Sequence, residues 1–83
     1  MQKEFIDGPF KKAYKNISKL KGAEKERAYA DLEERIEIYS VAKDFADYYP
    51  KIYTEDVLDE IVNAKNNIEA SNILTMLRRK QGD

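Results

Sequence analysis

The chain has 83 residues and a formal net charge of −1, and it contains no histidine, cysteine or tryptophan. A chain of this length forms one domain, and the missing residue types exclude an imidazole proton shuttle, a thiol nucleophile, a disulfide and metal ligation by thiolate or imidazole. No apolar run approaches the ~20 residues that span a bilayer, and residues 1–7 contain no signal-peptide core. We therefore expect one cytoplasmic domain over residues 1–83, with no cofactor and no bound metal.

Charge is segregated along the sequence although the total is small. Residues 1–22 carry a net charge of +4, residues 23–62 carry −7, and residues 63–83 carry +2. Two arrangements are consistent with this order. Either the basic ends neutralise the acidic middle once the chain is folded, or the segments form separate binding faces whose contacts weaken in salt.

The first predicted helix begins near Pro9 and ends at Gly22. Proline suits a first helical turn because its missing N–H would have no partner there, and glycine favours the left-handed conformation that ends a helix. Apolar residues follow at steps of three and four and define one stripe, namely Phe10, Ala13, Tyr14, Ile17 and Leu20. We expect Phe5 and Ile6, just upstream, to fold back onto the first turn.

The second predicted helix is the longest and covers about residues 23–48. Its apolar stripe contains Tyr29, Leu32, Ile36, Tyr39, Ala42, Phe45, Ala46 and Tyr49. Ile38, Val41 and Tyr48 lie off this stripe, so the apolar face widens toward the C-terminal end. We expect other helices or a second copy of the protein to cover that end. Pro50 should end the helix because proline disfavours helical geometry in the residue before it.

Two further helices follow in the C-terminal third of the chain. Thr54 is a good N-cap for the third helix. The buried side of this helix contains Val57, Leu58, Ile61 and Val62. Asn66 followed by Glu69 resembles a capping box, so we favour a break and a fourth helix from Ile68 to about Lys80. One continuous helix from Thr54 to Lys80 is the alternative.

The elements together predict an all-α fold, a small antiparallel helical bundle of three to four helices with a long second helix. Short connections at Gly22 and Pro50 favour antiparallel neighbours. Alternating polar and apolar runs are too short to predict a strand.

Aromatic residues gather where the long helix ends. Phe45, Tyr48, Tyr49 and Tyr53 lie around Pro50. Tyrosine is enriched in protein interfaces because it buries much area with few rotatable bonds and keeps a polar tip. The four aromatic residues are therefore our candidate partner-binding site, although the simpler interpretation is that their rings close the end of the bundle.

The function that follows is a non-enzymatic protein-binding module, such as a small regulator, inhibitor or immunity-type factor that acts through helix-surface contacts with a partner protein. No catalytic residue is predicted. The widened apolar face of the second helix also favours a homodimer. The abundance of Lys, Ile, Asn, Tyr and Glu is compatible with an AT-rich bacterial or phage genome.

An alternative function is nucleic-acid binding, with residues 54–80 forming a helix-turn-helix-like pair. The candidate contact residues are Asn72, Thr75, Arg78 and Arg79, joined by Lys11, Lys15 and Lys19 of the first helix. The lysines also suit an anionic membrane surface. An ordinary helix pair and a solvated basic face are the simpler interpretations, and a pI near 5.5 argues against a nucleic-acid ligand.

Acidic residues of the middle segment give a weaker signal. Glu33 and Glu37 lie one helical turn apart, as do Asp56 and Glu60, and such pairs suit a hard cation. The charge pattern favours a solvated helix face instead, because cations are interspersed among the acids. We therefore predict no metal site.

Overall fold

The computed structural model describes residues 3–82, which are helical apart from short connections. The helices are α1 (Lys3–Ile6), α2 (Lys11–Ser18), α3 (Gly22–Ala46), α4 (Glu55–Val62) and α5 (Asn67–Gly82). The structure is 76% helical, and no strand occurs among the residues that it describes. The predicted all-α fold is therefore confirmed, with the short α1 added ahead of the predicted helices.

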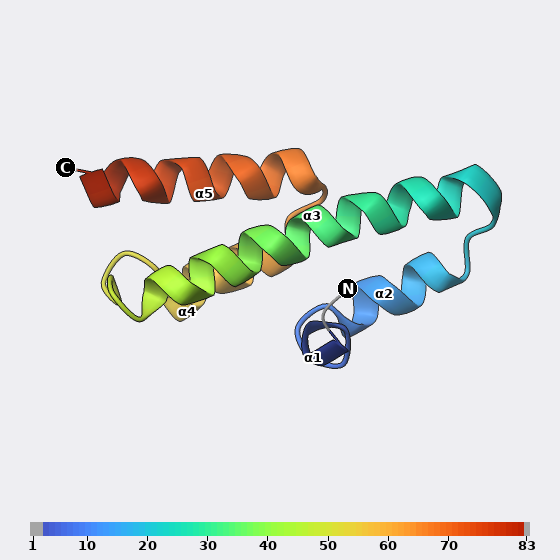
Figure 1. Ribbon diagram of the computed structural model, residues 1–83, viewed down its shortest axis with the longest axis horizontal. Coiled ribbons are helices and arrows are strands. Elements are labelled where there is room, and N and C mark those ends of the chain that lie inside the picture. Colours follow the sequence, from blue (N-terminus) through green and yellow to red (C-terminus); the bar gives the residue numbers. More distant parts are fainter. Residues whose placement is uncertain (1–2, 83) are drawn as a thin grey trace.

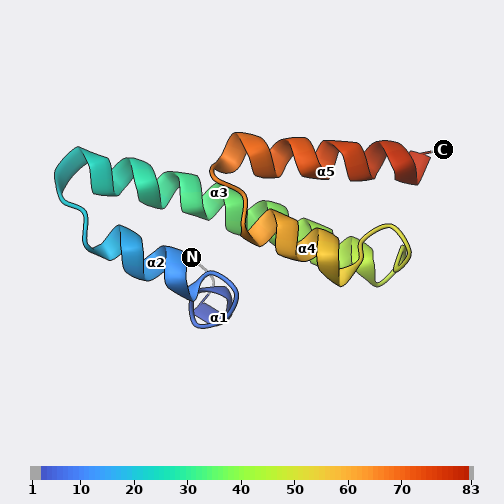
Figure 2. The ribbon, with the colours of Figure 1, turned by 180° about the vertical axis from the view of Figure 1, so that it is seen from behind.

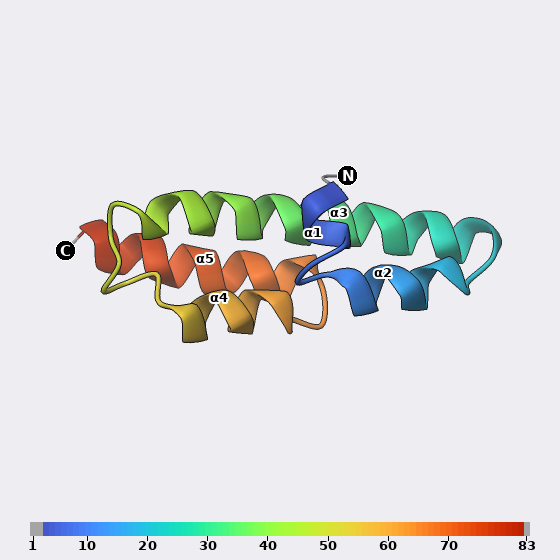
Figure 3. The same ribbon diagram turned by 90° about the horizontal axis from the view of Figure 1, so that it is seen from below.

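The long helix α3 is the spine of a molecule that measures 44 × 22 × 17 Å (Figure 1). Helix α2 packs along the N-terminal half of α3, whereas α4 and α5 pack along its C-terminal half (Figure 3). Helices α2 and α4 run antiparallel to α3, and α5 runs antiparallel to α4 (Figure 2). Three helices therefore surround one end of the molecule, which we call the three-helix end, and two form the other, the two-helix end.

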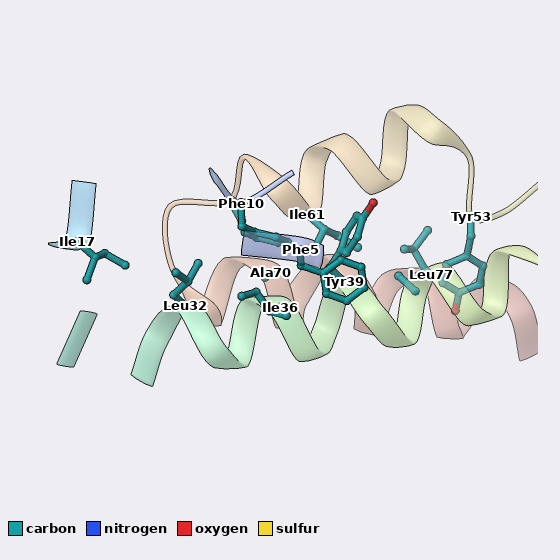
Figure 4. Close-up of a cluster of buried hydrophobic side chains, with 12 residues drawn as sticks. Phe5, Phe10, Ile17, Leu32, Ile36, Tyr39, Tyr53, Ile61, Ala70 and Leu77 are labelled. Carbon is teal, nitrogen blue, oxygen red and sulfur yellow. The ribbon is translucent and has the colours of Figure 1, made fainter. Parts of the chain in front are cut away.

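Buried apolar side chains form a row along α3 (Figure 4). Ile17 of α2 lies at one end of this row, Tyr39 of α3 lies near its middle, and Tyr53 and Leu77 lie at the other end. The most completely buried large side chains are Tyr53, Phe10, Leu32 and Ile61. Most of the core thus lies in the middle and at the three-helix end.

The N-terminal turn packs against the middle of α3. The rings of Phe5 and Phe10 meet the ring of Tyr39 edge-on, with centroid distances of 5.4 and 5.5 Å. The Phe10 N–H donates to the Phe5 carbonyl oxygen at 2.9 Å, Lys43 Nζ lies 5.6 Å from the Phe5 ring centroid, and Ile6 is half-buried against the core. The expected return of Phe5 and Ile6 onto the following turn is therefore confirmed.

The starts of α4 and α5 are fixed by side-chain caps that the sequence predicts. Thr54 Oγ1 accepts the Val57 N–H at 3.3 Å. Asn66 Oδ1 accepts the Glu69 N–H at 2.9 Å, and the Glu69 carboxylate accepts the Lys65 N–H at 3.2 Å, which makes a capping box displaced by one residue. The connection between α4 and α5 is not helical, so the alternative of one continuous helix is wrong.

Gly22 has the predicted left-handed conformation, with φ of 63°, but at a different helix end. Helix α2 already ends at Ser18, and α3 begins at Gly22, so the prediction that Gly22 ends the first helix is wrong. The Ser18 hydroxyl donates to the Lys15 carbonyl oxygen at 2.7 Å, the acceptor that a continuing helix would offer to the Lys19 N–H. The Lys19 N–H instead donates to the Asn16 carbonyl oxygen at 3.3 Å.

Arg35 joins α3 to the connection between α4 and α5. Its Nη1 donates to the Ala64 carbonyl oxygen at 2.9 Å, and its Nε forms an ion pair with Asp31 Oδ1 at 2.9 Å without an aligned hydrogen bond. The second oxygen of Asp31 accepts the Asn67 N–H at 3.0 Å, and the Asn67 amide donates to Glu34. This polar network lies beside the core, since the Arg35 side chain is only 12% exposed.

The C-terminal half of α3 is covered on two sides by α4 and α5, as its wide apolar face predicts (Figure 3). Ile38 is half-buried against the core. Val41 and Tyr48 remain 41% and 78% exposed. Helices of the same chain therefore cover part of this face, and a homodimer through the rest of it stays a prediction.

Candidate protein-binding surface

The tyrosine loop, residues 47–54, joins α3 to α4 at the three-helix end, where α5 also ends (Figures 1 and 2). Pro50 lies within this loop, and proline both disfavours helix in the residue before it and lacks an N–H donor. Helix α3 accordingly ends at Ala46. The candidate aromatic residues are thus distributed between the last turn of α3 and the loop.

Backbone hydrogen bonds give the loop a defined shape. The Phe45 carbonyl oxygen accepts the N–H groups of Tyr48 and Tyr49, at 3.0 and 2.8 Å. The Tyr49 carbonyl oxygen accepts the N–H groups of Ile52 and Tyr53, at 3.1 and 3.0 Å. Two successive turns therefore connect α3 to the start of α4.

Two of the four predicted contact residues lie inside the molecule. Tyr53 is 2% exposed, and its ring lies 5.5 Å from the ring of the half-buried Phe45. The Tyr53 hydroxyl donates to Gln81 Oε1 of α5 at 2.7 Å. Tyr53 is therefore not available for direct contact with a partner. Its contacts with Phe45 and Gln81 attach the loop to α3 and α5.

Burial also changes the acidity of Tyr53. Desolvation raises the pKa of its hydroxyl above the ordinary value of 10.0, the positive charge of Arg78 opposes this rise, and Tyr49 adds to it. The hydroxyl therefore stays protonated at neutral pH, as its role as donor to Gln81 requires.

The other two predicted residues form the surface. Tyr48 is 78% exposed and Tyr49 is 39% exposed. Together with Pro50, Lys51 and Ile52 they line a shallow, mostly apolar hollow of about 260 Å³. The loop thus offers aromatic and aliphatic area beside two phenol hydroxyls and one ammonium group, a combination suited to protein contacts.

The alternative nucleic-acid residues of α5 are also exposed. Asn72, Thr75, Arg78 and Arg79 all lie on its outer surface. The last three line a surface hollow of about 330 Å³. Helices α4 and α5 lie side by side and antiparallel along α3 (Figures 2 and 3), whereas the two helices of a DNA-binding helix-turn-helix cross at a steep angle.

The two cationic groups of that alternative are not brought together. Lys11, Lys15 and Lys19 are exposed on α2 at the two-helix end. Arg78 and Arg79 lie near the C-terminal end of α5, at the opposite end of the molecule (Figure 1). A single nucleic-acid groove that uses both groups is therefore not present.

Carboxylates do not converge on a metal-type site in the part of the chain that the structure describes. No group of three or more acidic side chains in that part lies close enough to hold an ion. Glu33 and Glu37, like Asp56 and Glu60, therefore form no larger ligand set.

No protein-family model matches the chain, and no curated protein or solved structure shows significant similarity to it. Among the helices formed by residues 3–82, none combines the length and apolar character needed to cross a membrane. We therefore infer its function from the surfaces of this molecule alone.

Proposed function

We propose that the protein is a non-enzymatic binding module of the cytoplasm that contacts a partner protein through the tyrosine loop, as a small regulator, inhibitor or immunity-type factor. One observation carries the proposal: Tyr48 and Tyr49 are exposed beside an apolar hollow on a loop that is held in place by hydrogen bonds and by the buried Tyr53. A surface that is ordered before binding loses little conformational entropy when a partner arrives.

The chemistry of the loop supports a protein partner in particular. Tyrosine is among the residues that dominate binding energy at interfaces. Ile52 and Pro50 add apolar area to the hollow, and Lys51 adds one charge at its edge. Such a mixture of apolar area with a few polar groups is typical of protein interfaces.

The test compares partner capture by the wild-type protein and by Tyr48→Ala/Tyr49→Ala from a lysate of the source organism. Both side chains are exposed, so the fold and the melting temperature should be retained. The affinity for the captured partner should fall about 30-fold or more, because truncation of an interface hot spot costs about 2 kcal/mol.

A matched control removes two exposed apolar side chains elsewhere. Ile68 and Met76 on α5 are 68% and 61% exposed, and Ile68→Ala/Met76→Ala should capture the partner as the wild type does. Equal capture by the tyrosine variant and the wild type would contradict the proposal, as would loss of capture in the control variant alone.

Nucleic-acid binding is the second candidate, supported by the hollow that Thr75, Arg78 and Arg79 line. A gel-shift titration with random DNA and RNA over a salt series distinguishes it. Salt-sensitive binding that disappears in Arg78→Ala/Arg79→Ala would replace the protein-binding proposal.

A further inference from the structure

Helix α2 presents an outer face that consists of lysines. Its inner side contains Phe10, Ala13, Tyr14 and Ile17, which are buried or half-buried. Lys11, Lys12, Lys15 and Lys19 lie on the opposite side and are exposed. None of the four forms an ion pair with another residue in the range 3–82. These four lysines therefore form a basic face on the outside of α2.

Helix α4 presents the opposite charge in the same way. Its inner side contains Val57, Leu58 and Ile61. Its outer side contains Glu55, Asp56, Asp59 and Glu60, all exposed, and within the described part of the chain these carboxylates likewise form no ion pair. Helix α4 itself contains no basic residue. Lys43 of α3 lines a hollow with Glu55 and Asp59, and Lys80 of α5 lines one with Glu60, so cations flank this acidic face on both sides.

The two faces are matched in size and position. Both helices have 8 residues, and three acids of α4 repeat the spacing of three lysines of α2, at i, i+1 and i+4. Both helices lie on the same side of α3, α2 along its N-terminal half and α4 along its C-terminal half (Figure 3). They follow one another along the spine, so their outer faces point away from the molecule and do not face each other within one chain.

We propose that this side of the molecule is an interface between two copies of the chain. A two-fold axis perpendicular to α3 places α2 of each copy against α4 of the other, antiparallel, so that each lysine face meets an acidic face twice. The surface is separate from the tyrosine loop, so the proposal stands or falls independently of partner capture there.

Salt should control this association strongly. The charged groups are exposed, so each ion pair contributes little by itself and the dimer is weak. The Debye length falls from about 30 Å at 0.01 M salt to about 3 Å at 1 M. The dimer should therefore form at low ionic strength and dissociate at high ionic strength, which is the opposite of what an apolar interface would do.

The test uses two matched charge reversals, K12E/K15E on α2 and D56K/D59K on α4, followed by sedimentation velocity over a concentration series. The wild type should associate at about 0.01 M salt and be monomeric at about 1 M. Each reversal leaves two positive and two negative charges on the changed face, so its charge no longer opposes that of the other face, and each variant alone should associate about tenfold or more weakly. All variants should retain the helical circular-dichroism signal, because the four side chains are exposed.

Mixing gives the decisive result. K12E/K15E and D56K/D59K carry complementary faces, so an equimolar mixture should form a heterodimer, and the chain with all four changes should recover the homodimer. Reversal of Glu37 and Asp44, which are exposed on α3, should leave association unchanged. A wild type that stays monomeric at low salt overturns the proposal. So does a mixture that fails to associate, or association lost by the α2 reversal alone, which would indicate that the lysines meet a different surface.

Discussion

The two ends of the molecule are built differently. At the three-helix end, α3, α4 and α5 enclose Tyr53 and Leu77. At the two-helix end, α2 packs on α3 with only the short α1 beside it, and the ring centroids of Tyr14 and Tyr29 are 5.7 Å apart. The candidate binding loop thus lies on the more enclosed end, whereas the lysine face lies on the end with less cover.

This difference implies uneven stability. A domain of this size has a free energy of unfolding of about 4–12 kcal/mol. Elements with fewer buried contacts open locally at lower cost than the core. Helix α2 should therefore open before α3, α4 and α5 separate, and the tyrosine loop should remain ordered until the whole domain unfolds.

The largest expected effect contrasts an isoleucine in the middle of the core, Ile61, with one at the two-helix end, Ile17 (Figure 4). Ile61→Ala should lower the free energy of unfolding by about 2–5 kcal/mol, because Ile61 is fully buried between helices. Ile17→Ala, in α2, should cost about 2 kcal/mol or less, because the neighbouring chain can relax into the space. Urea denaturation of both variants measures this difference, and equal losses would contradict the two-ended description.

The second effect concerns the polar network between α3 and the connection that joins α4 to α5. Arg35→Met should lower the free energy of unfolding by about 1.5–3 kcal/mol, because Asp31 and the Ala64 carbonyl oxygen both lose their charged partner. Arg27→Ala is the control, since Arg27 is exposed on the same helix and should change stability by less than about 0.5 kcal/mol. Equal melting temperatures for the two variants would show that the network does not contribute to stability.

The third effect belongs to the two-helix end. Gly22→Ala should cost about 1–2 kcal/mol, because a side chain disfavours the φ of 63° although the space around it is open. The loss should appear as faster amide exchange in α2 while exchange in α4 is little changed. A uniform change over both ends would instead indicate that the domain unfolds only as one unit.

The smallest effect is the pH dependence of Tyr53. Because the folded state holds the pKa of its hydroxyl above 10.0, the unfolded chain releases this proton first as the pH rises. Stability from this residue is therefore full below the unfolded pKa of 10.0 and is lost as the pH rises through the higher pKa of the folded state. Tyr53→Phe should cost about 0.5–1.5 kcal/mol at pH 7 and lose less additional stability than the wild type between pH 9 and 11, as measured by urea denaturation.

Much of the fold could be predicted because local chemistry marks the helix ends. Thr54, Asn66 and Glu69 cap helices in the structure much as their types and spacing predict. Gly22 shows what residue type does not predict. Glycine predicts the left-handed conformation that Gly22 has. It does not predict that α2 ends earlier, at Ser18, whose hydroxyl donates to the preceding turn of the helix.

The candidate site could be predicted only in part. Helical periodicity assigns faces as far as Ala46, but the loop breaks the period, so spacing does not separate the buried Tyr53 from the exposed Tyr48. The structural role of Arg35 could not be predicted either, because the sequence pattern of a basic residue among acids is also typical of a solvated helix surface. Only the position of the connection between α4 and α5 reveals its role.

We propose that the tyrosine loop is already ordered as a contact surface before any partner binds. Native-state hydrogen exchange of the Tyr49, Ile52 and Tyr53 amides, whose N–H groups are hydrogen-bonded in the loop, tests it most directly. We expect these amides to exchange about as slowly as those of α4 and more slowly than those of α2. Exchange at the rate of an unstructured peptide would contradict it.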